Sequence, residues 1–349
     1  MVERRGGNPR AAVVGTGLIG GSVLLRLHER GLDVAGWDPD AATRAQGRAR
    51  GIAFPDELAD AVRDRDVVFL CGPLSSLPDT LLTVAEHTGP DCVITDVGST
   101  KGGIAGFAAA HGLTDRFVPG HPMAGAERAG LTSADPGLLD GAAWVLCPTA
   151  EGVDRFRTLA ALVVDVFGAR VVPMAPDAHD AAAALASHVP HLLAGGLAGA
   201  VADSDLRDAV LGLAAGSFRD GTRVAATPAT RTADMLLNNR DQILDQLARV
   251  TGILDQFAAA LRAGDAATLV GHYQRARGLR LALLDRELSP VGRDFPVGVA
   301  VRQPAERPDA VDGELAYLLS LGAAGGHLTG CRVAAGTVTY TGHLPTAPS

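Results

Sequence analysis

A glycine-rich turn near the start of the chain constrains its fold more than any other feature. The apolar run AAVV (11–14) predicts a short β-strand, and the stretch after it, GTGLIGGSVLLRLHERG, predicts a turn that opens into a helix. Its glycines Gly15, Gly17 and Gly20 have the spacing G-x-G-x-x-G. In such a turn the first glycine permits a tight bend, the second lets a diphosphate approach the backbone, and the third lets helix and strand pack closely. The pattern predicts a dinucleotide-binding βαβ unit.

The second predicted strand, LDVAGWD (32–38), ends on an acidic residue at about the distance expected for such a unit. The carboxylate of Asp38 can accept hydrogen bonds from a ribose hydroxyl and would repel a 2′-phosphate. This favours NAD over NADP as the cofactor, while Arg44 is a nearby cation that works against the preference. The predicted cofactor-binding residues are Gly15, Gly17, Leu18, Ile19, Gly20 and Asp38.

Strand-like and helix-like segments alternate through the first half of the chain. The further β-rich runs are DVVFLCGP (66–73), CVITDVGS (92–99), FVPGHPM (117–123), AAWVLCP (142–148) and ARVVPM (169–174). Such alternation is typical of an α/β fold with a doubly wound parallel sheet. It predicts a Rossmann domain over residues 1–175.

Ligands of such sheets bind where the strands end. The segments DVGSTK and PGHPMAG stand at two of these ends, so we expect Ser99, Lys101 and His121 to converge near a bound nicotinamide. Lys101 is also the only lysine of the chain. The alternative for each residue is an ordinary position in a loop.

After Pro176 the strand signals stop and long helical patterns follow. Residues 176–288 predict an all-α domain for substrate binding and dimerisation. Because such a domain cannot easily bury all of its apolar helix faces alone, we expect a homodimer. Residues 289–349 predict a strand, a helix and two further strands, which form a short α+β C-terminal extension.

The segment SHVPH (187–191) holds two histidines and a proline within a predicted helix. On an ideal helix, which turns about 100° per residue, Asp180, Ser187 and His191 share a stripe about 40° wide. His188 points about 60–80° away from that stripe. The arrangement, with a kink at the proline, favours one wall of a polar pocket, and a plain core helix is the alternative. A metal would need a third converging ligand, so we expect no metal site.

The segment GSFRDGTRVA (216–225) places Asp220 and Arg223 in a loop or near a helix end. A guanidinium can bind a carboxylate through two parallel hydrogen bonds, which makes Arg223 a candidate for gripping an acidic substrate. A surface ion pair is the alternative.

The composition is that of a globular protein, with 47% hydrophobic and 20% charged residues. No apolar run approaches the roughly 18–20 residues of a membrane span, and the N-terminus lacks the apolar core of a signal peptide. These features predict a cytoplasmic protein without a membrane partner. The net charge of −8 disfavours nucleic acid as a partner. Four scattered cysteines without a C-x-x-C pair are expected to be reduced and mostly buried.

Taken in order, the motifs resemble those of the prephenate dehydrogenase family, which also includes arogenate dehydrogenases. The motifs are VVGTGLIGGS, DVGSTK, GHPMAGAERAG, HD…SHVPH and FRDGTRVA, and the resemblance covers roughly residues 11–285. It implies a Rossmann domain followed by a helical dimerisation domain. It also implies NAD-dependent oxidative decarboxylation of prephenate to 4-hydroxyphenylpyruvate in tyrosine biosynthesis.

The resemblance also assigns roles to individual residues. His121 would accept the proton of the substrate's ring hydroxyl, and Ser99 would hydrogen-bond near this histidine and the hydroxyl. Ser187 and His191 would face the substrate, and Arg223 would bind one of its carboxylates. Two acidic residues, Glu127 and Asp220, would form a polar gate near the pocket. The predicted substrate-binding residues are thus Ser187, His191, Arg223, Lys101, Glu127 and Asp220.

Several alternatives stay open at this point. The same fold and motifs suit L-arogenate, or the 4-amino-4-deoxyprephenate of secondary metabolism, as substrate. A 3-hydroxyacid dehydrogenase fits less well because that family lacks G-H-P-M-A-G and S-H-x-P-H, and an NAD-sensing regulator would not need an intact set of polar site residues. The extension 289–349 is either a diverged or shortened regulatory module of the amino-acid-binding type that some relatives carry, or an arm packed on the partner subunit.

Overall fold

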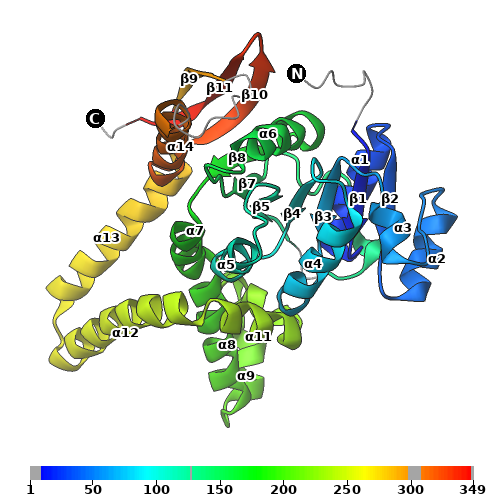
Figure 1. Cartoon of the computed structure of the whole chain (residues 1–349). Coiled ribbons are helices and arrows are strands. Elements are labelled where there is room, and N and C mark those ends of the chain that lie inside the picture. The colour runs from blue at the N-terminus through cyan, green and yellow to red at the C-terminus, as the bar shows by residue number, and fades with distance from the viewer. Residues whose placement is uncertain (1–8, 126–127, 298–307, 347–349) are drawn as a thin grey trace. The chain divides into compact units, whose positions relative to one another are not determined.

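The computed structural model divides into two compact units (Figure 1). The described residues are 9–125, 128–297 and 308–346. The first unit, called the sheet unit, contains the described residues up to His179, Pro228–Asn238 and Pro290–Leu344. The second, called the helical unit, contains Asp180–Thr227 and Asn239–Ser289. The sheet unit therefore includes two later segments, which the predicted division at 175 and 288 keeps apart from it.

The first sheet of the sheet unit is parallel throughout, with the strand order β2-β1-β3-β4-β5. Its strands are β1 (Ala11–Val14), β2 (Val34–Trp37), β3 (Val67–Leu70), β4 (Val93–Asp96) and β5 (Phe117–Val118). The strands are buried almost throughout, which fits their continuous apolar runs. The predicted Rossmann-type parallel sheet is confirmed.

Helices cover both faces of this sheet. They are α1 (Leu18–Glu29), α2 (Ala41–Ala49), α3 (Leu58–Val62), α4 (Leu77–His87), α5 (Gly102–Ala110) and α6 (Val153–Phe167), with the 3-10 turns η1 (Leu74–Ser76) and η2 (Leu131–Ser133). Successive strand residues point to opposite faces, so Phe69 enters one core with Leu24 of α1, while Val68 enters the other with Leu81 of α4. Two apolar cores therefore hold the sheet between its helices.

Six strands form a second, mixed sheet in the order β6-β7-β8-β10-β11-β9. They are β6 (Gly120–Pro122), β7 (Ala143–Leu146), β8 (Arg170–Pro173), β9 (Leu288–Pro296), β10 (His327–Ala334) and β11 (Thr337–Pro345). β6 is antiparallel to β7, and β10 is antiparallel to β8. The strands expected after β5 therefore do not continue the parallel sheet. The reason is that β6 follows β5 after Pro119 alone, which leaves no room for the crossover that a parallel neighbour requires.

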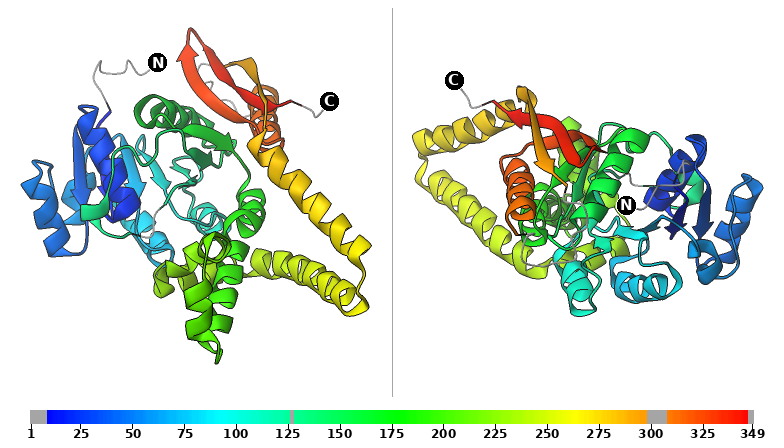
Figure 2. Two further views of the ribbon diagram at one scale, coloured as in Figure 1. Left: turned by 180° about the vertical axis from the view of Figure 1, so that it is seen from behind. Right: turned by 45° about the horizontal axis from the view of Figure 1, so that its top comes forward.

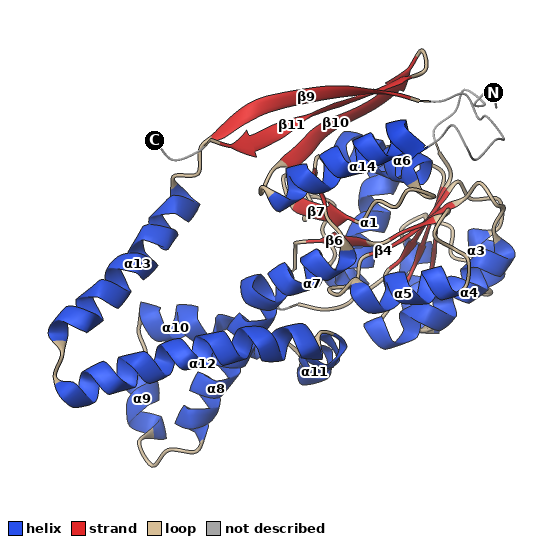
Figure 3. Ribbon diagram, turned by 60° about the vertical axis from the view of Figure 1, so that its left-hand side comes forward, coloured by secondary structure: helices blue, strands red, loops and turns tan. Residues whose placement is uncertain are grey.

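The C-terminal segment adds to the core of the sheet unit (Figure 3). β10 pairs with β8 through Leu328 and Val171. The helix α14 (Pro308–Ala323) lies so close to β8 that a Cβ added to Gly322 would come within 1.7 Å of the carbonyl oxygen of Pro173. Strand pairing and helix packing thus both tie this segment to the unit that carries the glycine turn.

A buried ionic cluster joins the same segment to α6. Nε of Arg157 donates to Oε1 of Glu314 at 2.9 Å, and its Nη2 donates to the other oxygen of that carboxylate. The hydroxyl of Tyr340 donates to Oε1 of Glu314 at 2.6 Å, and burial raises the pKa of this hydroxyl well above its usual range. The Glu314 side chain is fully buried and that of Arg157 is 5% exposed. Because buried charges need partners, the described residues 290–297 and 308–344 are an integral part of the sheet unit.

The four cysteines form no disulfide, in agreement with the expectation of reduced thiols. Cys92 and Cys147 are buried, and Cys71 and Cys331 are half-buried. Burial raises the pKa of the Cys92 thiol to about 11 and that of the Cys331 thiol to about 12. These two thiols therefore stay protonated and weakly nucleophilic at neutral pH.

The helical unit is all-α, as predicted, and α12 and α13 are its longest helices (Figure 2). Its elements are the π-helical turn η3 (Ala184–His188), α8 (Val189–Ala202), α9 (Arg207–Leu213), α10 (Gly216–Thr222), the 3-10 turn η4 (Arg223–Ala226), α12 (Arg240–Ala263) and α13 (Ala266–Leu284). The helix α7 (Pro176–Ala183) carries the chain into this unit, and α11 (Ala229–Asn238) belongs to the sheet unit.

Large apolar side chains are exposed on the helical unit of the single chain. Leu213 is 83% exposed and Leu261 is 67% exposed. Others of this kind are Leu197, Leu206, Leu211, Leu244, Ile253, Leu254, Val270, Tyr273, Leu279, Leu283 and Leu284. Exposed apolar surface of this extent is typical of an interaction surface.

The continuous helical stretch Pro176–Ala202, formed by α7, η3 and α8, is the one described helix whose length and composition would also suit a membrane span. This corrects the expectation that no segment of the chain reaches such a length. Five acidic and histidine side chains interrupt its apolar residues, at Asp177, His179, Asp180, His188 and His191. The same length and composition suit a helix that is covered by protein.

Candidate active site

The glycine turn between β1 and α1 has the close contacts that its spacing predicts. Gly15 has φ +88°, and a Cβ there would lie 2.8 Å from the backbone carbon of Cys71. A Cβ on Gly20 would lie 1.9 Å from the carbonyl oxygen of Gly15, whereas one on Gly17 would meet nothing within 4 Å. The turn is therefore tight where helix and strand meet and open at its middle glycine, which fits a diphosphate. The helix α1 begins at Leu18 without a side-chain cap, so its first amides suit an anion.

Asp38 lies directly after β2 and is fixed by the glycine turn. Its Oδ2 accepts hydrogen bonds from the backbone N–H of Thr16 at 2.8 Å and from the Thr16 hydroxyl at 3.3 Å. Its Oδ1 accepts from the backbone N–H of Asp40 at 3.0 Å. The carboxylate therefore stands beside the first glycines, where a ribose attached to the diphosphate would lie.

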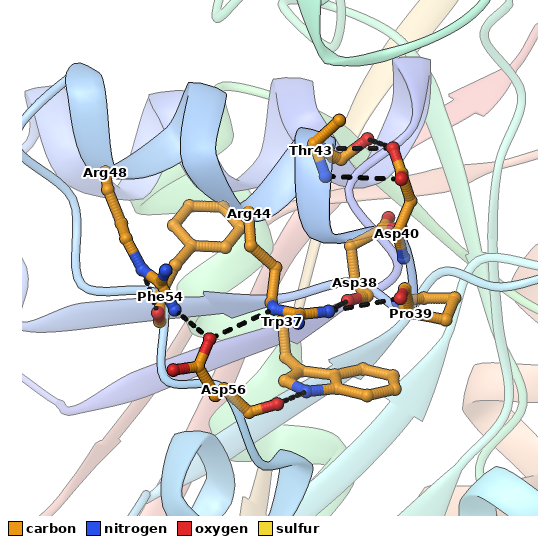
Figure 4. Close-up of polar contacts among 10 residues, drawn as sticks. Trp37, Asp38, Pro39, Asp40, Thr43, Arg44, Arg48, Phe54 and Asp56 are labelled. Carbon is orange, nitrogen blue, oxygen red and sulfur yellow. Dashed lines mark hydrogen bonds and ion pairs between the residues drawn. The ribbon is translucent and has the colours of Figure 1, made fainter.

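Arg44 is engaged by acceptors of its own surroundings (Figure 4). Its Nη1 donates to the carbonyl oxygens of Asp38 at 2.8 Å and Pro39 at 3.1 Å, and its Nε lies 3.6 Å from Oδ1 of Asp56. The hydrogen bond from Arg48 to the Asp56 carboxylate, with the charge of Arg48, holds the pKa of that carboxyl below its usual range. Since the Arg44 side chain is only 14% exposed, this cation is held in the wall of the site.

The loop after β4 is built around a buried ion pair. Asp96 accepts hydrogen bonds from the backbone N–H of Gly98 at 2.8 Å and of Gly120 at 3.0 Å. The ammonium of Lys101 forms an ion pair with the same carboxylate and donates to the carbonyl oxygen of Gly120 at 2.8 Å. Both charged side chains are fully buried. Ser99 lies in this loop and is half-buried.

This ion pair gives Lys101 a structural role in place of the predicted contact with the substrate. The sequence placed Lys101 among the residues that touch the substrate. In the structure its ammonium is buried against Asp96 and Gly120, because a buried ammonium needs a carboxylate and further hydrogen-bond acceptors. Lys101 and Asp96 together clamp the start of β6 to the end of β4.

His121 follows that clamped residue on β6 and is half-buried. Its Nδ1 lies 2.9 Å from Nε2 of His179 on α7, and the two rings meet edge to face at 77°, with centroids 5.1 Å apart. His179 is 2% exposed. No role could be assigned to His179 from the sequence, although the HD…SHVPH motif begins with it, because its pairing with His121 depends on the tertiary structure.

In the helical unit the structure separates the two histidines of SHVPH. His188 is fully buried, and its Nδ1 lies 2.9 Å from Nδ2 of Asn239, which also donates to the carbonyl oxygen of Asp180 at 2.8 Å. His191 and Ser187 are half-buried and one turn apart, with Nδ1 of His191 2.9 Å from the carbonyl oxygen of Ser187. His188 is therefore a core residue, and the other two residues remain candidates for the pocket.

The predicted stripe over this helix is wrong in one respect. It included Asp180 with Ser187 and His191 on the assumption of a regular α-helix. The π-helical turn at Ala184–His188 inserts an extra residue per turn and rotates the residues before it relative to those after it. Ser187, within the turn, and His191, one turn later, still lie next to each other, as the 2.9 Å contact of Nδ1 of His191 with the carbonyl oxygen of Ser187 shows.

Arg223 and Asp220 lie on exposed positions at the junction of α10 and η4. The turn η4, which begins at Arg223, packs against α8, the helix that carries His191. The helical unit thus brings the predicted carboxylate grip and the predicted pocket histidine onto neighbouring elements. Glu127 lies outside the described residues. Among the residues that the structure describes, no group of three histidines, cysteines or carboxylates could hold a metal ion.

Two family models match the chain. Residues 23–173 match the model of the prephenate dehydrogenase nucleotide-binding domain, and residues 175–275 match that of the prephenate dehydrogenase dimerization domain. The chain is 30% identical to a cyclohexadienyl dehydrogenase of Zymomonas mobilis, over 80% of this chain and 98% of that protein. It is 31% identical to a prephenate dehydrogenase of Bacillus subtilis, over 82% of this chain and 80% of that protein.

Solved structures agree with these matches. An arogenate dehydrogenase of Synechocystis, 29% identical, superposes with a TM-score of 0.68 over 78% of this chain and 98% of that one. A prephenate dehydrogenase of Aquifex aeolicus in complex with hydroxyphenyl propionate and NAD+ is 24% identical. It shares the fold, with a TM-score of 0.73 over 80% of this chain and 100% of that one.

Proposed function

Because the chain belongs to the prephenate dehydrogenase family, we propose that it catalyses the oxidative decarboxylation of prephenate to 4-hydroxyphenylpyruvate. The family consists of dehydrogenases with a nucleotide-binding domain, and NAD is the cofactor. One observation carries the proposal. His121 lies at the clamped start of β6, in the same unit as the glycine turn, with its Nδ1 on His179.

The reaction needs a base at the hydroxyl of the carbon that loses hydride. NAD+ supplies the hydride acceptor when it is bound. His121 is the base in this proposal, because a neutral imidazole can take the hydroxyl proton, and Ser99 orients the hydroxyl from the neighbouring loop. Loss of CO₂ then makes the ring aromatic, which supplies the driving force.

The glycine turn and Asp38 are the residues that would hold the cofactor. The open side of Gly17 and the first amides of α1 suit its diphosphate, and the fixed carboxylate of Asp38 suits the ribose hydroxyls. Arg44 already donates to two carbonyl oxygens and lies near the carboxylate of Asp56. Its charge and its donors therefore attract a 2′-phosphate only weakly. We therefore propose a strong preference for NAD+ over NADP+.

The substrate contacts in this proposal are assigned residue by residue from the family motifs. Arg223 grips a carboxylate, Ser187 and His191 face the ring, and Asp220 with Glu127 forms a polar gate. Lys101 acts by holding β6 in place and makes no direct contact with the substrate. We further propose a cytoplasmic homodimer, supported by the match to a dimerization domain and by the exposed apolar side chains of the helical unit.

Two substrates compete with prephenate in this proposal. L-Arogenate and 4-amino-4-deoxyprephenate share its ring and differ in the side chain or in the C4 substituent. The test is the rate of NADH formation with each of the three compounds at matched concentrations. We expect the highest kcat/KM with prephenate. A higher value with arogenate or with the amino analogue would reassign the substrate, and no turnover with any of them would refute the proposed activity.

A further inference from the structure

We propose that His179 is a positioning residue that sets the tautomer of His121 and stabilises the imidazolium formed during turnover. The inference deepens the proposed function and rests on His121 being the base. It starts from the histidine pair of the sheet unit, in which Nδ1 of His121 and Nε2 of His179 are 2.9 Å apart.

The geometry leaves His121 few orientations. The residue before it, Gly120, is held through both its N–H, by Asp96, and its carbonyl oxygen, by Lys101. The ring is then the part of His121 that can still turn. His179 meets this ring edge to face and is itself buried, with its backbone N–H bonded to the carbonyl oxygen of Ala175 at 2.9 Å. A rigid partner of this kind can select one ring orientation.

Proton placement decides what the pair can do. A contact between two imidazole nitrogens needs one donor and one acceptor. If His179 donates, the proton of neutral His121 is on Nε2, and that atom cannot accept another. If His121 donates from Nδ1, its Nε2 keeps a lone pair and can take the hydroxyl proton of the substrate. Only the second arrangement makes His121 a base at Nε2.

The same arrangement helps after the proton has moved. The imidazolium of His121 then carries protons on both nitrogens, and its Nδ1–H still donates to Nε2 of His179. A hydrogen bond from a charged donor is stronger than one from a neutral donor. His179 thereby takes, as a neutral acceptor, the place that a carboxylate occupies behind the histidine of a serine protease.

The first experiment reads the tautomer directly in the protein without substrate. ¹⁵N-histidine NMR of the full chain resolves the ring nitrogens, and the resonances that vanish in His121→Asn belong to His121. At a pH where His121 is neutral, we expect its proton on Nδ1 in the wild type, and a shift towards Nε2 in His179→Leu. A proton on Nε2 in the wild type, or an unchanged tautomer in the variant, overturns the proposal.

The second experiment separates positioning from folding. His179→Leu should lower kcat by about 10- to 100-fold, the usual range for residues that orient a reactive group, with KM changed less than about threefold. His179→Gln should recover most of this loss, because its amide oxygen can accept from Nδ1 of His121. Wild-type kcat in His179→Leu, or no recovery with Gln in a folded variant, contradicts the proposal.

A matched control uses another buried histidine of the same unit. His327 on β10 is 5% exposed, and its ring stacks on His343 at 5.4 Å. His327→Leu should change thermal stability without changing the His121 tautomer or kcat. The tautomer is measured without substrate, so the two proposals can be told apart. If the wild type turns over none of the three substrates but the His121 tautomer is as expected, the proposed activity is refuted, and the effect of His179 on the tautomer is still supported.

Discussion

The two units bury their apolar side chains very differently. In the sheet unit, residues as large as Trp144 and Phe69 are fully buried within the single chain. In the helical unit, Leu213 and Leu261 stay mostly exposed. A sheet covered by helices on both faces can complete its core alone, whereas long helices with apolar sides need a further surface. The proposed base, its histidine neighbour and the predicted cofactor site lie on the sheet unit, and the predicted substrate grip lies on the unit whose apolar side chains stay exposed.

The largest expected effect concerns the base in the sheet unit. His121→Asn removes the only proton acceptor proposed there, so kcat should fall by about 10²–10⁴-fold while KM stays within a few-fold. The wild-type rate should fall in acid, as imidazoles protonate, and the variant should lose this dependence. Steady-state kinetics across pH measure both effects. His111→Asn, on an exposed helix end, is the control. If His121→Asn keeps the acid limb and most of its rate, His191 becomes the next candidate.

The second prediction tests whether the sheet unit needs its C-terminal segment. Glu314→Gln leaves the buried guanidinium of Arg157 without its buried carboxylate partner and with only the exposed Asp154, which should cost about 3–5 kcal/mol of unfolding free energy. Denaturant titration measures this cost. Asp154→Asn is the matched control, because Asp154 pairs with the same arginine but is 72% exposed, and its loss should cost at most about 1 kcal/mol. An equal loss of unfolding free energy in the two variants would show that the buried pair does not hold the C-terminal segment to the sheet unit.

The third prediction tests the substrate grip of the helical unit. Arg223→Ala should raise KM for prephenate by an amount worth about 2–4 kcal/mol, because a substrate carboxylate loses its two-pronged partner. Arg223→Lys should restore only part of this, since an ammonium lacks the planar fork. Arg219→Ala, on the preceding helix α10, is the control. Wild-type KM in Arg223→Ala would remove this residue from the site.

The fourth prediction tests the cofactor side of the sheet unit. Asp38→Ser should narrow the preference for NAD+ over NADP+ by about 10- to 100-fold, because the repulsion of a 2′-phosphate disappears. The ratio of kcat/KM for the two cofactors is the measurement. Asp40→Ser is the control and should leave this ratio unchanged, because Asp40 caps α2 and serine can also cap a helix. A wild type that uses both cofactors equally would contradict the role of Asp38.

The smallest expected effect concerns the exposed apolar surface of the helical unit. Leu261→Glu places a charge on the exposed apolar surface of α12 and should weaken dimerisation about tenfold or more. Light scattering over a dilution series measures it. Val333→Glu is the control, since Val333 is 53% exposed on β10 of the sheet unit. A wild type that is monomeric at micromolar concentration would overturn the proposed homodimer.

The turns, strands and helices of this protein could be predicted from its sequence alone. The spacing of Gly15, Gly17 and Gly20 predicted a turn that the structure confirms. A Cβ on Gly15 or Gly20 would collide with nearby backbone, and Gly17 is open. The apolar runs predicted the five strands of the parallel sheet and the helical character of the second half. Order along the chain is enough for such features because backbone sterics and hydrophobic periodicity are local properties.

Contacts between side chains far apart in the chain became visible only in the tertiary structure. His121 and His179 are 58 positions apart, and Arg157 and Glu314 are 157 positions apart. Neither pair can be predicted from the hydrophobic periodicity of the sequence. They meet because β6, β8 and β10 belong to one sheet, which brings α7 and α14 to the same unit. Lys101 looked like a substrate contact for the same reason, since only the closed fold shows that its ammonium is buried on Asp96. Burial and pairing follow from how the sheets close, and that closure is a property of the whole chain.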